Sequence, residues 1–236
     1  MANTFFKFKQ FTIHQEKCAM KVCTDSCLFG AWITLPKNAK TVLDIGAGTG
    51  LLSLMTAQKN KTTTIHAIEM DENANNQCKE NFEISTWKDR LRIFLGDVRS
   101  FPFEQKYDFI ISNPPFYEQE KKSKTHSENM AKHSEYLTLS ELLDVINKLL
   151  SPTGQFAILL PYYRKVEVEN LAAQFGYFAI DTFSIRQSDA HSFFRFAAIF
   201  SKQKSTVHNL EISIKNKQQE YTVDAIHLLQ PYYLFL

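Results

Sequence analysis

The chain has 236 residues, of which 44% are hydrophobic and 22% are charged. This length suits one large domain, and this balance is typical of a folded globular protein rather than a disordered one. The 27 lysines and arginines against 25 aspartates and glutamates leave a formal charge of +2, so nucleic-acid binding would need a local basic surface rather than bulk charge.

The sequence gives no sign of membrane insertion or export. No apolar run approaches the roughly 20 residues of a membrane-spanning helix, and Lys7 and Lys9 interrupt the N-terminal apolar stretch where a signal peptide would continue. We therefore expect a cytoplasmic protein that does not contact a membrane.

Four cysteines occur in the first third of the chain, and in the cytoplasm they are expected to be free thiols. The spacing of His14, Cys18, Cys23 and Cys27 matches neither the zinc patterns nor the iron–sulfur patterns of known sites. We expect buried or half-buried thiols there, as for Cys78, and no metal.

The predicted elements alternate between strands and helices through most of the chain. They are, in chain order, a short hairpin within residues 1–17, a helix over 25–35 with Asp25 as its N-cap, a strand over 41–45, a helix from 51, a strand over 64–69, a helix over 71–82, strands over 90–95 and 107–112, a helix over 138–150, strands over 155–161, 178–184 and 193–200, a strand near 210–214 and a helix near 222–229. Such alternation favours a parallel α/β sheet. The strands over 178–184 and 193–200 follow each other without a helix and indicate an antiparallel hairpin at the sheet edge.

The helix over 138–150 has the clearest signal. Apolar residues recur at helical spacing from Leu139 to Leu150. Thr138 and Glu141 form a capping box at its start, and Pro152 with Gly154 should end it.

Glycine is scarce in this chain, and three of its seven glycines lie within five residues. Gly46, Gly48 and Gly50 follow the strand over 41–45 and open the next helix, which is where an open parallel sheet binds ligands. The spacing G-x-G-x-G lacks the third glycine of a dinucleotide fingerprint, because Leu51 stands there, and no Gly-Lys-Ser/Thr of a P-loop follows. Asp44, two residues earlier, would favour a cationic ligand over an anionic pyrophosphate.

Two further acids follow the next two predicted strands. Glu69 ends the strand over 64–69, where a carboxylate can accept both ribose hydroxyls, and Asp97 follows the strand over 90–95, where it can accept from an adenine amino group. Together with Asp44 they indicate a nucleoside that carries positive charge, and S-adenosylmethionine fits this description.

The strand over 107–112 runs directly into Asn113-Pro114-Pro115-Phe116. Two prolines fix two φ angles and remove two N–H donors, so this segment forms a stiff platform rather than a strand or helix. The Asn113 carboxamide oxygen and the Pro114 carbonyl can each accept a proton from a planar amino group, which turns the nitrogen lone pair toward a methyl donor. Phe116 can stack on a base, which contributes about 1–3 kcal/mol.

These motifs carry a family resemblance. Asp44–Gly50 with Asn113–Phe116 resembles the class I methyltransferases that act on exocyclic amino groups. Residues 17–25 and 28–32, residues 129–133 and the terminal Tyr-Tyr-Leu-Phe-Leu are similar to the bacterial tRNA1(Val) adenine N6-methyltransferase family, which modifies the adenine just 3′ of the anticodon. The resemblance covers nearly the whole chain.

The resemblance implies a Rossmann-like class I methyltransferase fold, α/β, with a mostly parallel seven-stranded sheet and an antiparallel edge hairpin. It implies a single domain over 1–236, in which residues 1–35 form an N-terminal hairpin and helix that cover the cofactor and residues 205–236 form a C-terminal strand and helix appendage. Cys23 departs from the family, where glycine is expected before Thr-Asp, and this puts the turn that leads Thr24 over the cofactor in doubt.

The implied activity is transfer of a methyl group from S-adenosylmethionine to N6 of adenine 37 in tRNA1(Val), by a monomer that uses no metal. The candidate catalytic residues are Asn113, Pro114, Pro115 and Phe116. The candidate cofactor-binding residues are Thr24, Asp44, Gly46, Gly48, Gly50, Glu69, Asp97 and Asn113.

Basic residues beyond Phe116 are expected to hold the RNA on either side of a flipped base. The candidate RNA-binding residues in this polar segment are Lys121, Lys122, Lys124, Lys132 and His133. Two further basic strips are Lys7, Lys9, Lys17 and Lys21, and Arg186, Arg195 and the lysines from Lys202 to Lys217.

Other functions remain open at this level. The same loop chemistry serves rRNA guanine N2, DNA adenine N6 and protein glutamine N5, although 236 residues leave little room for a DNA-recognition segment. A non-catalytic RNA-binding adaptor that keeps the nucleoside pocket is a second alternative, and a nicotinamide-dependent oxidoreductase, which Leu51 disfavours, is a third.

Overall fold

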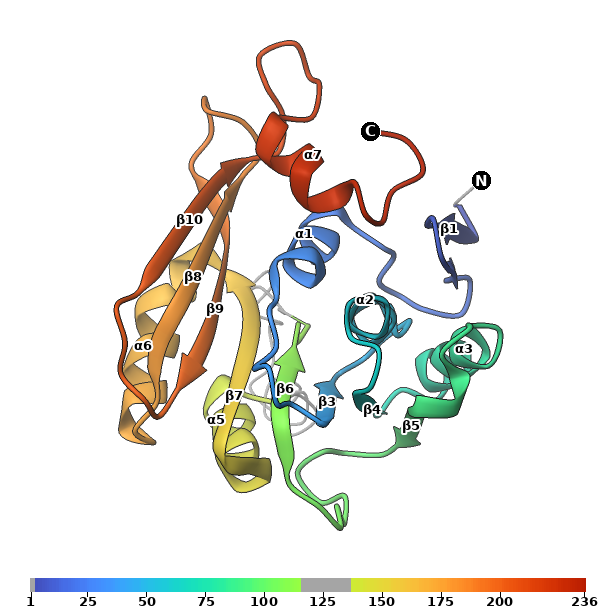
Figure 1. Ribbon diagram of the computed structural model, residues 1–236, viewed down its shortest axis with the longest axis vertical. Coiled ribbons are helices and arrows are strands. Elements are labelled where there is room, and N and C mark those ends of the chain that lie inside the picture. The colour runs from blue at the N-terminus through green and yellow to red at the C-terminus, as the bar shows by residue number, and fades with distance from the viewer. Residues whose placement is uncertain (1–2, 116–136) are drawn as a thin grey trace, which may run out of the picture.

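A mostly parallel sheet runs through the molecule, with helices packed on both of its faces (Figure 1). The computed structural model describes residues 3–115 and 137–236. Its strands are β1 (Phe5–Lys7), β2 (Thr12–His14), β3 (Thr41–Ile45), β4 (Thr64–Glu69), β5 (Leu91–Leu95), β6 (Tyr107–Ser112), β7 (Leu150–Pro161), β8 (Phe178–Arg186), β9 (Phe193–Ser201) and β10 (His208–Ser213). Its α-helices are α1 (Thr24–Trp32), α2 (Leu51–Lys59), α3 (Glu72–Glu83), α5 (Leu139–Leu149), α6 (Lys165–Gln174) and α7 (Val223–Leu229), and short 3₁₀ turns cover Lys88–Arg90 and Tyr162–Arg164.

The central sheet has eight strands in the order β10-β8-β9-β7-β6-β3-β4-β5. Only β9 runs antiparallel to its neighbours β7 and β8, so the predicted hairpin is present. The eighth strand is β10, which pairs in parallel with β8 and therefore takes the sheet edge that the sequence assigned to the hairpin. β1 and β2 form a separate antiparallel pair.

Most predicted elements are confirmed. β3, β4 and β6 have the predicted bounds, and α5 begins at the predicted capping box, in which the Thr138 side chain accepts from the Glu141 N–H and the Glu141 side chain accepts from the Thr138 N–H. The helix α3 begins after Asp71, whose carboxylate accepts from the Ala74 N–H at 2.8 Å.

Three elements differ from the prediction. Asp25 is not the N-cap of α1, because Cys23 holds that position without a side-chain cap bond and the Asp25 carboxylate pairs with Arg195 instead. β7 begins at Leu150 rather than at residue 155. Pro152 lies where the register between β6 and β7 shifts, and a strand tolerates a proline at such an irregularity. The helix α6 was not predicted, since only Val168 and Ala172 of it are buried and its apolar stripe is weak.

Two hydrophobic clusters fill the spaces between sheet and helices. One joins the sheet to α1, α2 and α7, and the other joins it to α5 and α6. Figure 1 shows these two sets of helices on opposite faces of the sheet. The structure thus has the three-layer arrangement expected for a doubly covered parallel sheet.

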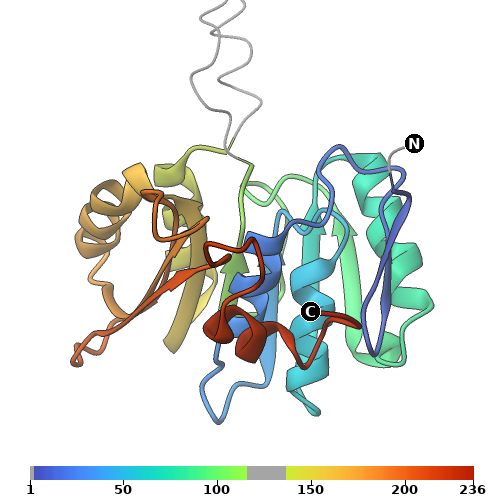
Figure 2. The ribbon, with the colours of Figure 1, turned by 90° about the horizontal axis from the view of Figure 1, so that it is seen from above.

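The N-terminal and C-terminal segments lie side by side (Figures 1 and 2). Phe8 forms an isolated antiparallel bridge with Tyr233, and the Lys9 N–H donates to the Tyr232 carbonyl at 2.7 Å. The C-terminal segment also reaches α1, because α7 packs against it and the Tyr233 side chain contacts Thr24 and Cys27. Parts of the chain that are farthest apart in sequence therefore meet beside the first helix.

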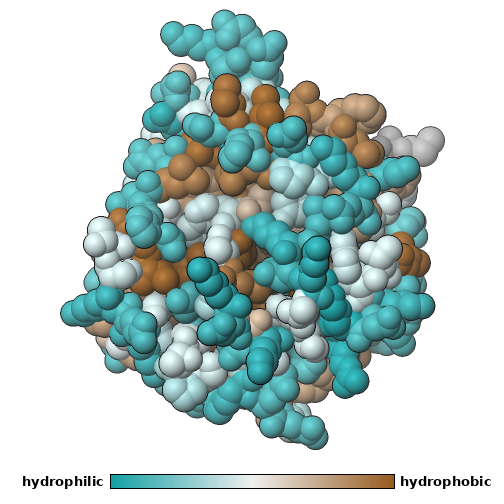
Figure 3. Space-filling model, viewed as in Figure 1, coloured by the Kyte–Doolittle hydropathy of each residue, from teal (hydrophilic) through white to brown (hydrophobic). Residues whose placement is uncertain are grey.

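Apolar side chains gather on the surface over α7 and the C-terminal segment, in the upper part of the view in Figure 3. Val223 is 81% exposed and Phe235 is 88% exposed. Among the helices that the described residues form, none combines the length and the apolar character needed to cross a membrane.

The three glycines between β3 and α2 are not equivalent. All three have positive φ angles, but a Cβ added to Gly50 would lie 2.7 Å from both Cys78 Sγ and the Phe82 ring, whereas a Cβ at Gly46 or Gly48 would meet no atom within 4 Å. Gly50 therefore allows α2 to pack closely against α3, while the other two leave open space in front of the backbone.

We expect Gly50→Ala to lower the free energy of unfolding by about 2–4 kcal/mol, because it combines a left-handed backbone with an overpacked contact. The matched control is Gly176→Ala, where φ is also positive but nothing lies within 4 Å, and about 1 kcal/mol should be lost. Urea unfolding of both variants measures the difference. Equal losses would show that the contact with α3 contributes nothing.

Candidate active site

The residues singled out in the sequence follow four neighbouring strands of the sheet. The adjacent parallel strands β6, β3, β4 and β5 end next to Asn113, the glycine loop, Glu69 and Asp97 respectively. Because these strands are parallel, their carboxyl ends lie at one edge of the sheet, and the four features form a row along it.

Two hollows adjoin this row and share Gly46. The larger encloses about 630 Å³, including solvent at its mouth, and is lined by Ile45, Gly46, Ile68, Glu69, Met70, Gly96, Asp97, Val98, Arg99, Ser112, Pro114, Pro115 and Leu137. The smaller encloses about 440 Å³ and is lined by Met20, Lys21, Val22, Ser26, Gly46, Ala47, Gly48, Thr49, Leu51, Leu52 and Asn113. Together they form a depression of the size that small-molecule sites have.

The glycine loop is held open by hydrogen bonds from its backbone. The Gly46 N–H donates to the Ile68 carbonyl at 2.9 Å, and the Gly48 N–H donates to the Glu69 carboxylate at 2.9 Å. With φ angles of 72° and 55° and no neighbour at the Cβ positions, Gly46 and Gly48 present bare backbone to the depression. A ligand can approach this backbone closely.

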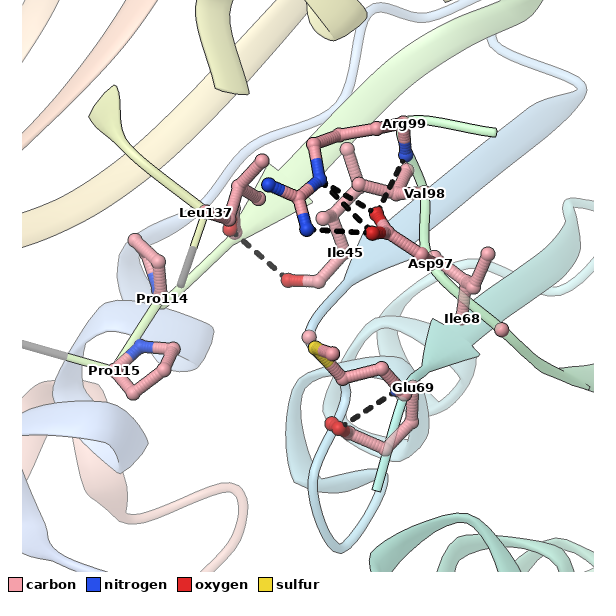
Figure 4. A pocket seen from close by; sticks show the side chains of 13 residues that line it. Ile45, Ile68, Glu69, Asp97, Val98, Arg99, Pro114, Pro115 and Leu137 are labelled. Carbon is pink, nitrogen blue, oxygen red and sulfur yellow. Dashed lines mark hydrogen bonds and ion pairs between the residues drawn. The ribbon is translucent and has the colours of Figure 1, made fainter. Parts of the chain in front are cut away.

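Glu69 sits at the centre of the row. Its other carboxylate oxygen accepts from the backbone N–H groups of Met70 and Asp71, at 2.9 and 3.0 Å. These bonds fix the carboxylate at the end of β4 and direct it toward the larger hollow, opposite Pro114 and Pro115 (Figure 4).

Asp97 is paired within the structure. Its carboxylate accepts from Arg99 Nε at 2.9 Å and from Arg99 Nη2 at 2.6 Å, and these bonds hold the pKa of Asp97 below its usual range. Arg99 also reaches Glu141, the N3 residue of α5, at 3.3 Å. The arginine therefore joins the wall of the larger hollow to the start of α5 (Figure 4).

Asp44 lies beneath the glycine loop and is 1% exposed. Its Oδ2 accepts from the Ser53 hydroxyl at 2.7 Å, but Oδ1 has no hydrogen-bond partner among the described residues. Burial raises the pKa of Asp44 to about 7. An incompletely satisfied buried carboxylate next to open backbone suits a site that takes up a cationic ligand.

Asn113 joins the Asn-Pro-Pro segment to the first helix. Its Nδ2 donates to the Ser26 hydroxyl of α1 at 3.0 Å, and Ser112 just before it donates from its hydroxyl to the Ile45 carbonyl at 2.9 Å. Pro114 and Pro115 lie on the side of the larger hollow opposite Glu69 and Asp97 (Figure 4). The stiff platform and the acids therefore face each other across the hollow.

The structure brings together most of the predicted site residues. Gly46, Gly48, Glu69, Asp97, Asn113, Pro114 and Pro115 line the two hollows. Asp44 lies buried below them, and Gly50 serves the packing of α2. Thr24 lines neither hollow and instead contacts Tyr233 through its side chain. Phe116, Lys121, Lys122, Lys124, Lys132 and His133 lie outside the described residues.

Within the segment that was predicted to cover the cofactor, residues 20–22 line the smaller hollow. The Cys23 backbone, at φ −128° and ψ 154°, is extended. Any residue adopts this conformation, so the missing glycine does not disturb the turn. All four cysteines are free thiols, and burial raises the pKa of Cys23 to about 11. Among residues 3–115 and 137–236, no cluster of three or more His, Cys, Asp or Glu side chains could hold a metal ion.

Two residues that bind site residues were not singled out from the sequence. The Ser26 hydroxyl accepts a hydrogen bond from Asn113, which follows β6. Arg99 donates to Asp97, which lies two residues before it on the same loop. An arginine two residues after an acid at a strand end was the available signal for Arg99. Nothing in the sequence connects Ser26 to Asn113, 87 residues later.

Several residues of the other two basic strips, the one from Lys7 to Lys21 and the one from Arg186 to Lys217, bind groups of the protein itself. Lys17 pairs with Glu80, Lys9 donates to the Gln230 carbonyl, and Arg195 pairs with Asp25. The third strip is also divided, because Arg186 and Arg195 lie at the end of the β8–β9 pair where β8 ends, whereas Lys202 follows the opposite end of β9.

Comparison with known proteins agrees with this geometry. Residues 29–178 match the family described as the methyltransferase small domain. A crystal structure of a predicted O-methyltransferase from Agrobacterium tumefaciens superposes with a TM-score of 0.68 at 11% identity, covering 87% of this chain and 95% of that one. A methyltransferase from Pyrococcus furiosus gives a TM-score of 0.56 at 21% identity, covering 78% and 84%. These structures share the fold.

Relatives of higher identity extend over nearly the whole chain. A tRNA1(Val) (adenine(37)-N6)-methyltransferase from Dyadobacter fermentans is 41% identical, over 88% of this chain and 86% of the relative. A protein of the same name from Flavobacterium psychrophilum is 36% identical, over 97% and 99%. With a methyltransferase fold, an open glycine loop and an Asn-Pro-Pro platform facing two acids, this chain belongs to the tRNA1(Val) (adenine(37)-N6)-methyltransferase family.

Proposed function

We propose that this protein transfers a methyl group from S-adenosylmethionine to the exocyclic N6 of adenine 37 in tRNA1(Val). The observation that carries the proposal is the position of Asn113, which lines the same small hollow as Gly46 and Gly48. An amide that can hold an amino group thus lies beside the backbone that can hold a methyl donor. The full-length relatives named for this reaction support the choice of substrate.

The residues around the hollows fit the chemical parts of S-adenosylmethionine. Gly46 and Gly48 leave the room that a closely bound ligand needs, the unpartnered Oδ1 of Asp44 suits its positive charge, and Glu69 and Asp97 suit the ribose hydroxyls and the adenine amino group. When bound, S-adenosylmethionine supplies an activated methyl group. Residues 20–22 would cover it from the side of the smaller hollow.

The protein's own contribution is to hold the acceptor. In this proposal the Asn113 carboxamide oxygen and the Pro114 carbonyl each accept a hydrogen bond from the amino group of adenine. The two prolines fix two φ angles and so keep the backbone of this segment rigid. Phe116 stacks on the base, and the basic residues that follow it hold neighbouring phosphates. No strong general base is required, because the methylated amine loses its extra proton to water afterwards.

We further propose that the chain works as a monomer and as one domain over 1–236. The support for one domain is the contact between its ends, in which Phe8 pairs with Tyr233 while α7 packs against α1. Residues 20–22 and Ser26, which precede the matched region 29–178, line the smaller hollow.

Asn113→Ala tests the acceptor role directly. Loss of a preorganised hydrogen-bonding group at the reacting atoms should lower kcat by about 10²-fold, whereas the affinity for S-adenosylmethionine should change little. Transfer of tritiated methyl groups to a tRNA1(Val) transcript, followed by nucleoside mass analysis, gives the rate and the modified position. Asn209→Ala on the distant edge strand β10 is the control.

Either of two results would contradict the proposal. One is full activity of the Asn113 variant, which would remove the amide from the chemistry. The other is equal methylation of a transcript that carries guanine in place of adenine 37, which would exclude N6 of that adenine as the acceptor.

Asp44 should make both stability and cofactor affinity depend on pH. Its pKa in the folded protein, about 7, lies above the ordinary value of 3.8, so the folded state binds the proton more tightly and its stability falls as pH rises from 4 through 7. Asp44→Asn removes the free-energy cost of burying an ionised carboxylate. In the absence of cofactor, the variant should therefore have a higher melting temperature than the parent at pH 8. At pH 4 the two melting temperatures should be nearly equal.

The same substitution should weaken binding of S-adenosylmethionine by about tenfold or more at pH 8, because a buried charge pair is lost. In the parent protein the affinity should rise between pH 6 and pH 8, as the carboxylate becomes ionised. Calorimetric titration and thermal melts measure both effects, with Asp144→Asn on the exposed face of α5 as the control. A pH-independent affinity of the parent would contradict the assignment.

A further inference from the structure

The carboxamide of Asn113 has two ends of similar shape and opposite hydrogen-bonding character. The oxygen accepts hydrogen bonds, whereas the nitrogen only donates them. An amino group that is to be methylated can be held by the oxygen alone. An amide that turned freely would spend part of its time with the wrong end toward the substrate, so its orientation is part of the acceptor site.

Ser26 contacts the nitrogen end of this amide. Asn113 Nδ2 donates to Ser26 Oγ at 3.0 Å, and Ser26 is only 5% exposed. On its other side, the same hydroxyl lies 3.0 Å from Cys23 Sγ. A hydroxyl has one proton, and when it donates that proton to the sulfur, only an N–H of Asn113 can face it.

We propose that Ser26 is a positioning residue, which sets the Asn113 carboxamide with its oxygen directed at the acceptor amino group. The inference rests on the proposed function, because it assigns to Ser26 a part in holding the amino group. Ser26 itself does not touch the reacting atoms.

The first turn of α1 is anchored firmly enough for this task. Asp25 pairs with Arg195 of β9 at 2.7 Å, and its other oxygen accepts from the Ser26 N–H at 3.0 Å. The Asp25 side chain is only 10% exposed, so solvent screens this pair little. Arg195 therefore holds the turn from a strand that lies outside the matched region 29–178.

The platform on the opposite side is anchored as well. Ser112, which precedes Asn113, is fully buried and bonded to the Ile45 carbonyl at 2.9 Å, and two prolines follow Asn113. With both backbones fixed, the amide can adjust only by rotation of its own side chain. One hydrogen bond from the amide nitrogen to the Ser26 hydroxyl is then sufficient to choose between its two orientations.

The test is Ser26→Ala, measured as methyl transfer to tRNA1(Val) at saturating S-adenosylmethionine. The lost bond is worth about 0.5–1.5 kcal/mol, so kcat should fall about 2- to 12-fold, while the KM for S-adenosylmethionine stays within a factor of two. Ser26→Thr, which keeps the hydroxyl, should recover most of the loss. Ser85→Ala, which removes a buried hydroxyl after α3, should leave the rate unchanged.

A double-mutant cycle separates positioning from a general structural effect. If Ser26 acts through the amide, Ser26→Ala should cost nothing more in an Asn113→Ala background. A loss of the same size in both backgrounds would overturn the proposal, and so would an unchanged kcat of Ser26→Ala in the parent.

The side-chain amide can also be observed without tRNA. In nuclear magnetic resonance spectra, one Asn113 side-chain N–H should exchange slowly with solvent in the parent and rapidly in Ser26→Ala. Rapid exchange in the parent would overturn the inference. If the parent fails to methylate tRNA1(Val), the proposed function falls, and this exchange measurement still decides whether Ser26 holds the amide.

Discussion

The site depends on one constraint, which is that four neighbouring strands of the sheet are parallel. Their carboxyl ends therefore reach one edge together, and any polar residue placed just after a strand arrives beside those that follow the other three. The order β6-β3-β4-β5 also fixes the sequence of features along that edge. It places the Asn-Pro-Pro segment after β6 next to the glycine loop after β3, with the two acids beyond.

The three carboxylates at this edge have three different environments. Glu69 accepts from three backbone N–H groups, Asp97 is paired with Arg99, and Asp44 is buried with one oxygen unpartnered. Only Asp44 is left at an energetic disadvantage in its ionised form, since a buried carboxylate with a single hydroxyl partner and no neighbouring cation is costly. A positively charged ligand is therefore expected to gain most from Asp44, whereas the other two acids are oriented in advance.

Much of this arrangement could be predicted from the sequence because its signals are local. The β-branched strand at 41–45, the glycine spacing and the Asn-Pro-Pro segment each act through neighbouring residues, and the capping box at Thr138 formed as expected. The partners of Asp25 and Asn113 could not be predicted. Each bond joins residues far apart in the chain, and such pairings are set by how the elements pack rather than by sequence pattern. The helix α6 was missed for a related reason, since its weak apolar stripe becomes evident only against β8.

The closure of the first helix by the end of the chain has a consequence for biosynthesis. Asp25 pairs with Arg195, which is 170 residues later in the chain, and Phe8 pairs with Tyr233. A ribosome delivers these partners last, so α1 cannot be locked while the nascent polypeptide is still being made. The strands β3 and β6, which precede the glycine loop and the Asn-Pro-Pro segment, are synthesised earlier. A product truncated before Arg195 would lack the ion pair that fixes the first turn of α1. Only the finished polypeptide can therefore make all the contacts that fix α1 beside Asn113.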